Sequence, residues 1–262
     1  MAGYCSGGSS TVATADKVDF GTDITAAQAS ANLSVAKGGQ ANCDNGTTKG
    51  YNIAGSSAAA VATTDKTTFA HDTTIACPSA DLGTAAYHSA GISGPTFGYI
   101  AGGNTGAAAT VVAYKLTYAT DVTATQSSAN LANAKEYHAS VSERSTKGYW
   151  AGGTSAAGTQ LATAEMITFS TDTTAAQASA NLSQARYRGT CGCDGEGTKG
   201  YYLGGFTASA NVVTGDKITY STDTTAAQVS SNLWRRHNLR QSNLLHRYHS
   251  SASVGSADRY SH

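Results

Sequence analysis

Three pairs of adjacent residues combine a tyrosine ring with a group that can donate hydrogen bonds. The pairs are Tyr87-His88, Tyr137-His138 and Tyr187-Arg188. Each pair begins five or six residues after a leucine that recurs once per repeat. A tyrosine with a neighbouring donor can stack on a sugar ring and bond its hydroxyl groups, although burial with a bonded hydroxyl is the commoner use. The pattern predicts a ligand-binding site at these six residues. The alternative is that the tyrosines pack between units while the His or Arg side chains lie in water.

Five aspartates occupy one recurring turn position. They are Asp23, Asp72, Asp121, Asp172 and Asp223, spaced by 49 to 51 residues. An aspartate in a turn often accepts hydrogen bonds from its own backbone, whereas a calcium ion needs six or more oxygen ligands. We therefore expect these carboxylates to cap their turns, with cation binding as the alternative. We expect no metal site and no cofactor.

Charged side chains alternate along a second recurring segment. It contains Asp16-Lys17, Asp65-Lys66 and Asp216-Lys217, with Lys115 and Glu165 as partial copies. Such alternation indicates a solvated outward face of a strand. The chain has no phosphate-binding, Ser-His-Asp or zinc-hydrolase motif. Among its five cysteines, no second close pair joins Cys191 and Cys193 to complete a zinc site. The sequence therefore predicts that the protein is not an enzyme.

A six-residue segment, Gly148-Tyr149-Trp150-Ala151-Gly152-Gly153, organises the chain. Its copies start at residues 3, 50, 98, 148 and 200, so the period is 47 to 52 residues. A period of about 40–50 residues with a double glycine is typical of propeller blades or a solenoid. The predicted repeat array covers residues 1–233. Its units are 3–49, 50–97, 98–147, 148–199 and 200–233.

Each unit carries the same succession of short segments. In the first unit, Asp16–Phe20 alternates polar and apolar residues and predicts a half-buried strand. Ala26–Ala36 is rich in alanine, so a short helix or 3₁₀ turn is the alternative to extended chain there. One tyrosine, one further aromatic and one leucine per unit suffice for a single buried layer between adjacent units. No unit is therefore expected to fold alone.

The composition changes abruptly after Leu233. The formal net charge of the whole chain is zero, and 13% of its residues are charged, so global charge attracts neither nucleic acid nor a membrane. Residues 234–262, however, contain five Arg and four of the seven His. This change indicates either a specialised tail or translation in a shifted frame. A specialised tail could close the last blade as its missing strand, and binding of nucleic acid or an acidic partner is a weaker alternative. Neither a membrane-spanning run nor a secretory leader is expected.

The double glycines and the downstream aromatics resemble kelch-type repeats. The glycine pairs are Gly7-Gly8, Gly102-Gly103, Gly152-Gly153 and Gly204-Gly205. The chain looks most like the divergent Gly-Tyr-x-x-Gly-Gly repeats of phage and bacterial surface proteins. This resemblance implies an all-β, propeller-like array of about five four-stranded blades, each of about 50 residues. The rival arrangement is an open solenoid, a β-helix or a ring completed by other chains.

Fold resemblance alone leaves function open, because propellers host enzymes, lectins and scaffolds. The resemblance implies a glycan- or receptor-binding, or structural, component of a phage particle, such as a tail fibre, or of a bacterial surface assembly. Its partners would be a cell-surface glycan or other protein subunits. The alternatives are a protein-interaction scaffold and a purely structural decoration, and a third class is an enzyme on a propeller, such as a glycan hydrolase, which would need a carboxylate pair at a set separation. The expected location is the virion or the cell surface, with the cytoplasm as the alternative.

Overall fold

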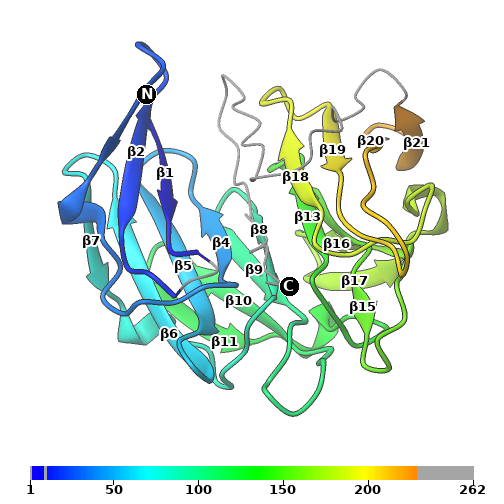
Figure 1. Cartoon of the computed structure of the whole chain (residues 1–262), viewed down its shortest axis with the longest axis horizontal. Coiled ribbons are helices and arrows are strands. Elements are labelled where there is room, and N and C mark those ends of the chain that lie inside the picture. Colours follow the sequence, from blue (N-terminus) through cyan, green and yellow to red (C-terminus); the bar gives the residue numbers. More distant parts are fainter. Residues whose placement is uncertain (1, 9–10, 229–262) are drawn as a thin grey trace.

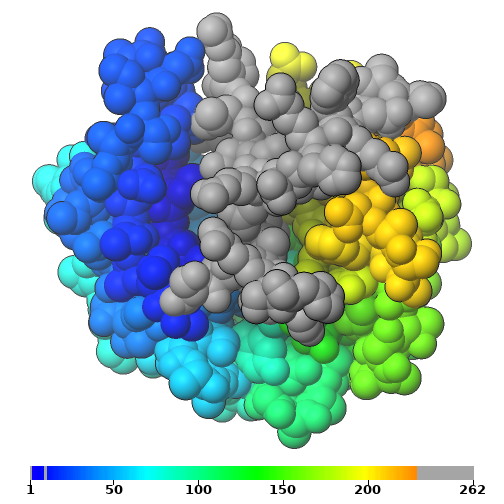
Figure 2. Space-filling view, viewed as in Figure 1, coloured from blue at the N-terminus to red at the C-terminus, as the bar shows by residue number. Residues whose placement is uncertain are grey.

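The structure is a computed structural model that describes residues 2–8 and 11–228. Five small antiparallel sheets are arranged around a common centre as the blades of a β-propeller (Figure 1). Successive blades form adjoining sectors of one face, following the chain from blue to orange (Figure 2). The expected all-β array of about five blades is confirmed, and it is a propeller, not the rival open solenoid or β-helix. Within the described ranges, no helix is long and apolar enough to cross a membrane.

The blades are numbered along the chain. Blade 1 contains β1 (Ala2–Ser6), β2 (Ala15–Asp19) and β3 (Ile24–Ala27). Blade 2 contains β4 (Ala41–Asp44), β5 (Lys49–Ser56), β6 (Ala60–Thr68) and β7 (Thr73–Ala76). Blade 3 contains β8 (Ala90–Ser93), β9 (Phe97–Ala101), β10 (Ala113–Thr117) and β11 (Val122–Thr125). Blade 4 contains β13 (Ala139–Ser142), β14 (Lys147–Ala151), β16 (Ala164–Thr168) and β17 (Thr173–Ala176). Blade 5 contains β18 (Thr190–Cys193), β19 (Lys199–Leu203), β20 (Gly215–Thr219) and β21 (Thr224–Gln228).

Short elements lie in the connections between blades. A two-stranded ladder joins β12 (Lys135–Glu136) to β15 (Thr154–Ser155). Four 3₁₀ helices follow the outer strands of blades 1 to 4. They are η1 (Ala29–Ala31), η2 (Pro78–Ala80), η3 (Ser127–Ala129) and η4 (Ala178–Ala180). The alternative of a 3₁₀ turn within Ala26–Ala36 is therefore the one that forms.

Each of blades 2 to 5 combines strands from two consecutive sequence repeats. The strand β4 ends the first repeat, yet it pairs with β5, which begins the second. The same step recurs at β8, β13 and β18. Each of the first four repeats thus contributes its last strand to the following blade, so consecutive blades share strands of one repeat. In the described part of the chain, blade 1 has three strands. The predicted closing segment, 234–262, lies outside the described residues.

The apolar core lies between the blades. Tyr51 and Tyr118 stack with their ring centres 5.8 Å apart, and Tyr99 and Phe169 stack at 5.5 Å in the next contact. Leu82 is 5% exposed and packs in the same layer. Each of blades 2 to 4 has a neighbouring blade on both faces. Polar side chains on either face of these blades can therefore also be buried. This arrangement confirms the single buried layer expected between units.

The double glycines have a backbone conformation that residues with a side chain rarely adopt. Gly102 and Gly103 have φ values of 66° and 94°. A Cβ at Gly102 would lie 2.6 Å from the carbonyl oxygen of Lys135 in the connection to the next blade. In blade 2 the equivalent pair is Ala54 and Gly55, with φ values of 57° and 122°. The motif therefore marks a left-handed turn that lets the following connection approach closely.

Candidate functional site

The predicted binding residues lie in the connections that lead into the innermost strands. His88, Tyr137 and Arg188 occupy one equivalent position, six residues after the repeat leucine, with φ values of 55° to 58°. The His88 amide donates to the Gly39 carbonyl at 2.7 Å, and the Tyr137 amide donates to His88 at 3.1 Å. The Arg188 amide donates to Tyr137 at 3.0 Å. These backbone bonds step from blade to blade and place three unlike side chains beside one another.

The side chains of these residues stack on each other. His88 and Tyr137 have ring centres 3.7 Å apart and are stacked, and Tyr87 meets His88 edge-on at 4.6 Å. The Arg188 guanidinium lies 4.3 Å from the centre of the Tyr137 ring, and its Nη2 donates to the Tyr137 hydroxyl at 2.8 Å. Tyr187 lies 6.1 Å from Tyr137. The structure thus brings five of the six predicted residues into one half-buried cluster.

Three further residues complete this cluster and were missed by sequence reasoning. Phe206 lies 5.9 Å from Tyr187, centre to centre. Glu136 lies beside His88, with Oε2 3.5 Å from Nδ1, and accepts a hydrogen bond from Asn104 at 3.1 Å. Burial opposes ionisation of Glu136, but the neighbouring His88 and the hydrogen bond from Asn104 outweigh it and hold its pKa below the usual range. We call the complete cluster the aromatic mouth. It consists of Tyr87, His88, Asn104, Glu136, Tyr137, Tyr187, Arg188 and Phe206.

His138 lies apart from the aromatic mouth. It is 6% exposed and packs beneath the glycine turns, near Gly102 and Gly153. Burial, followed by the charge of Lys135, lowers the pKa of His138 to about 3, so the ring is neutral at ordinary pH. His88 follows its repeat leucine by six residues, and in the next repeat the residue at that distance is Tyr137, not His138. A one-residue difference between the Tyr87-His88 and Tyr137-His138 pairs explains the separate place of His138.

The turn aspartates of blades 2 to 5 bond to the preceding blade, so the capping expectation is wrong for them. The Tyr51 hydroxyl of blade 2 donates to Asp121 of blade 3 at 2.5 Å, and Lys66 lies 2.7 Å from the same carboxylate. Burial works against ionisation of Asp121, but the hydrogen bonds from Lys49, Lys66 and Tyr51 lower its pKa to about 2. The equivalent tyrosine–aspartate bonds are Tyr4–Asp72, Tyr99–Asp172 and Tyr149–Asp223. In residues 2–8 and 11–228, no cluster of His, Cys, Asp or Glu is placed to hold a metal ion.

The prediction of a solvated charged strand face is also wrong for three of its carboxylates. Asp65 and Asp216 are fully buried, and Glu165 is 2% exposed. Each pairs with a buried cation four residues after the repeat leucine. The pairs are Lys37–Asp65 at 3.1 Å, Lys135–Glu165 at 2.9 Å and Arg186–Asp216. These carboxylates also accept backbone N–H bonds from the connection, so they fasten it to the blade. In blade 3 the equivalent residues are Ala86 and Tyr114, both buried.

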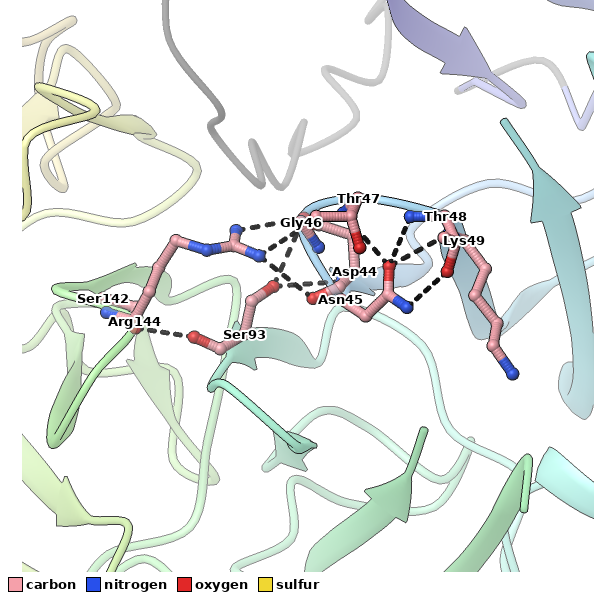
Figure 3. A network of polar contacts seen from close by, with 9 residues as sticks. All are labelled: Asp44, Asn45, Gly46, Thr47, Thr48, Lys49, Ser93, Ser142 and Arg144. Atoms are coloured by element: carbon pink, nitrogen blue, oxygen red, sulfur yellow. Dashed lines mark hydrogen bonds and ion pairs between the residues drawn. The ribbon is translucent and has the colours of Figure 1, made fainter. Parts of the chain in front are cut away.

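A polar network joins three blades at the turns that follow the innermost strands (Figure 3). Arg144, in the turn after β13, reaches Asp44 at the end of β4, with Nη2 and Oδ1 2.7 Å apart. Ser93 of the intervening blade accepts a hydrogen bond from the Asp44 amide at 3.0 Å. The Ser142 hydroxyl donates to the Ser93 carbonyl at 2.7 Å. Because Arg144 and Asp44 are 100 residues apart, no local pattern in the sequence marks this network.

A cavity of about 240 Å³ opens between blades 3 and 4. Phe97, Tyr99 and Phe169 line it, with Thr96 and Ser170 among its polar residues. The hairpin between β8 and β9 is one residue shorter than its counterpart between β13 and β14. At the position of Lys147, which reaches Asp223, blade 3 has Phe97. These two differences leave aromatic surface at this contact between blades.

The five cysteines are free thiols. Cys5 is exposed, whereas the other four are buried. Burial raises the pKa of the Cys43 thiol, and the nearby Asp44 charge adds to the effect. Burial also raises the pKa of Cys193. A raised pKa keeps the thiols of Cys43 and Cys193 protonated, whereas a nucleophilic cysteine reacts as the thiolate.

Comparison with known proteins bears on the fold. No protein-family model matches the chain, and no curated protein matches its sequence significantly. Among solved structures, 164 chains match it. The structure of YjhT superposes with a TM-score of 0.71 at 10% identity, covering 88% of this chain and 81% of that one. At this identity the likeness concerns the fold alone, and it agrees with the propeller arrangement.

Proposed function

We propose that this chain is a non-enzymatic binding protein that holds a cell-surface glycan at the aromatic mouth. One observation carries the proposal: tyrosines from two different connections, Tyr137 and Tyr187, meet beside His88, Glu136 and Arg188. Aromatic faces suit the apolar face of a pyranose, and the charged groups around them suit its hydroxyls. The stacking that holds these rings together also reduces the conformational entropy lost on binding.

The biological setting belongs to the same proposal. The Gly-Tyr-x-x-Gly-Gly repeats resemble kelch-like repeats of phage and bacterial surface proteins. We place the chain in a phage particle or bacterial surface assembly on that resemblance. The second candidate is a protein-interaction scaffold or structural decoration. The bonds that tie each blade to the next favour it, because they make a rigid array on which other subunits could assemble.

Calorimetry with surface polysaccharide from candidate host cells tests the glycan proposal. We expect saturable binding by the wild type and at least roughly ten-fold weaker binding by Tyr87→Ala and Tyr187→Ala, since each change removes one stacking face. Tyr4→Ala is the control, because Tyr4 is half-buried in blade 1 and bonds Asp72 outside the aromatic mouth. Folding of each variant is checked by circular dichroism. A folded wild type that binds none of the polysaccharides would overturn the proposal and favour the scaffold.

A further inference from the structure

The contact between blades 3 and 4 lacks a lysine that the contacts on either side of it have. Lys49, Phe97 and Lys147 begin the second strand of blades 2, 3 and 4, and each pairs with a threonine at the end of the third strand. The Lys49 ammonium donates to Oδ1 of Asp121 at 2.5 Å and to the Tyr118 carbonyl at 2.7 Å. Lys147 bonds the turn aspartate of blade 5 at 2.5 Å. Phe97 has no donor in its side chain, so it makes no such bond.

The cavity between blades 3 and 4 borders the place of the missing ammonium. Its volume is about 240 Å³, and Phe97, Tyr99 and Phe169 supply its aromatic walls. Phe169 is the counterpart of Tyr118, because each ring stacks on the tyrosine of the preceding blade. In the contact between blades 2 and 3, the carbonyl of this residue accepts the bond from Lys49. The cavity therefore lies where the fold elsewhere places a lysine side chain.

The carboxylate at this contact has room for a second cation. Asp121 is bonded by two lysines, with Lys49 and Lys66 at 2.5 and 2.7 Å. Asp172 is its counterpart in blade 4, and in the described part of the chain Lys115, at 2.7 Å, is the one lysine that bonds it. The contact between blades 2 and 3 thus shows that two ammonium groups can share such a carboxylate. Asp172 lacks the second of them.

The walls of the cavity suit an alkylammonium group. The face of an aromatic ring attracts a cation, and the Lys115 ammonium already lies 3.6 Å from the centre of the Phe97 ring. Apolar surface also packs well against the methylene stem of a lysine, while its charged end stays among polar groups. Thr146 and Ser170 provide hydroxyl groups at this cavity. A side chain with an apolar stem and a positive end therefore fits it better than an anion does.

We propose that this cavity binds a lysine side chain of a partner protein. The ammonium of that side chain takes the place that Lys49 holds in the contact between blades 2 and 3, and its stem lies against Phe97 and Phe169. The site is separate from the aromatic mouth, because His88 precedes β8 whereas the hairpin that lines the cavity follows β8. The two sites lie at opposite ends of this strand. The inference is therefore independent of glycan binding.

Nuclear magnetic resonance titration of the full chain with Nα-acetyl-lysine amide tests the proposal. We expect saturable binding with a Kd of about 1 to 10 mM, and shifts at the amides of Thr146 and Ser170. Nα-acetyl-norleucine amide has a similar stem without the charge, so it should bind at least about ten-fold more weakly. Glucosamine carries an amine without the stem, and it should also bind at least about ten-fold more weakly.

Phe97→Lys is the variant that fills the cavity from within. Lys49 and Lys147 occupy this place in the adjacent blades, so we expect the variant to fold. It should bind the lysine amide at least about ten-fold more weakly than the wild type, because its own ammonium takes the site. Tyr187→Ala is the control, since it alters the aromatic mouth and leaves the cavity intact. It should bind the lysine amide like the wild type.

Four results would overturn the lysine site. The first is a wild type that shows no saturable shifts at Thr146 and Ser170 with up to about 100 mM lysine amide. The second is equal or tighter binding of norleucine amide or glucosamine, because neither combines the stem with the charge. The third is a folded Phe97→Lys variant that binds like the wild type. The fourth is loss of lysine amide binding in Tyr187→Ala, which would place the ammonium at the aromatic mouth. None of these outcomes depends on whether a glycan binds.

Discussion

Arg144 of blade 4 bonds Asp44 of blade 2 and passes over blade 3 to do so. Its Nη2 lies 2.7 Å from Oδ1, and it also reaches the Asp44 carbonyl at 3.3 Å. Burial opposes the charge of Arg144, but the Asp44 carboxylate outweighs it and raises the pKa of the guanidinium. Contacts between adjacent blades fix only neighbours, whereas this bond fixes the position of one blade relative to the next but one.

Arg144→Met should lower the free energy of unfolding by about 1 to 2 kcal/mol, because methionine keeps the apolar stem but leaves Asp44 without its cation. Urea unfolding measures the change. Ser145→Ala in the same turn is the control, since its hydroxyl is exposed and bonds only Glu143. A double-mutant cycle with Asp44→Ala isolates the pair. A coupling energy near zero would contradict the bridge.

The buried ion pairs lead to a second prediction, because blade 3 has apolar residues at the positions where the other blades have an ion pair. Lys135→Met should destabilise the protein by about 3 to 5 kcal/mol, since Glu165 would stay buried without its cation. Replacing both residues by those of blade 3, as Lys135→Ala with Glu165→Tyr, should recover most of that loss. Blade 3 packs Ala86 and Tyr114 there, 3% and 5% exposed.

Thermal and urea unfolding of the single and double variants check this prediction. Glu165→Tyr alone serves as the control, because it leaves Lys135 buried without a carboxylate. A double variant no more stable than Lys135→Met would show that the site in blade 4 needs its ion pair for a reason other than charge compensation.

The period and the double glycine indicated propeller blades or a solenoid, and the resemblance to kelch-type repeats favoured the propeller over an open array. The glycine pair is needed wherever the backbone turns left-handed under the next connection, as at Gly102 and Gly103. The pairing of β4 with β5 was not visible, because a repeat motif does not show which strand neighbours which. The tyrosines of the aromatic mouth could be predicted because a tyrosine recurs five or six residues after the repeat leucine in three repeats. Glu136 and Phe206 could not, since each lies at a position that other repeats fill differently.

The prediction that Asp65, Glu165 and Asp216 lie on a solvated face is wrong for a physical reason. When only one face of a sheet packs against another element, alternating polar and apolar residues indicate that the polar face lies in solvent. In this propeller an inner blade has a neighbour on each face, so Asp65 lies in a polar interior position and meets Lys37 from the incoming connection. Sequence alone gives no distance between residues 37 and 65, and the ion pair depends on that distance.

Acid should weaken the hydrogen bonds between the turn aspartates and the tyrosines of the preceding blades. The folded-state pKa of Asp121 is about 2, below its ordinary value of 3.8, because the bonds from Lys49, Lys66 and Tyr51 exceed the opposing effect of burial. A carboxylate with a depressed pKa contributes stability that is present above its unfolded pKa and lost as pH falls through the folded one. Stability should therefore decrease between about pH 4 and pH 2. Asp121→Asn should reduce that slope.

Unfolding free energies measured from pH 6 to pH 2 test this dependence. Asp23→Asn is the matched control, because Asp23 occupies the same turn position in blade 1 and is exposed. It should keep the wild-type slope, because the tyrosine bonds to turn aspartates are made by its four counterparts in blades 2 to 5. An identical slope for Asp121→Asn and the wild type would mean that Asp121 does not titrate with folding.

Ala54→Gly should stabilise the protein. Ala54 holds φ at 57°, where the other double-glycine turns place glycine, and a left-handed residue with a Cβ costs roughly 1 to 2 kcal/mol. Glycine also loses more backbone entropy on folding, by roughly 0.5 to 1 kcal/mol, so the net gain should be about 0.5 to 1 kcal/mol. Gly102→Ala is the converse control. It adds the same strain and a contact with the Lys135 carbonyl, so it should cost more than Ala54→Gly gains. If thermal unfolding shows Ala54→Gly to be destabilising, the Ala54 methyl, 1% exposed, packs well enough to offset its backbone strain.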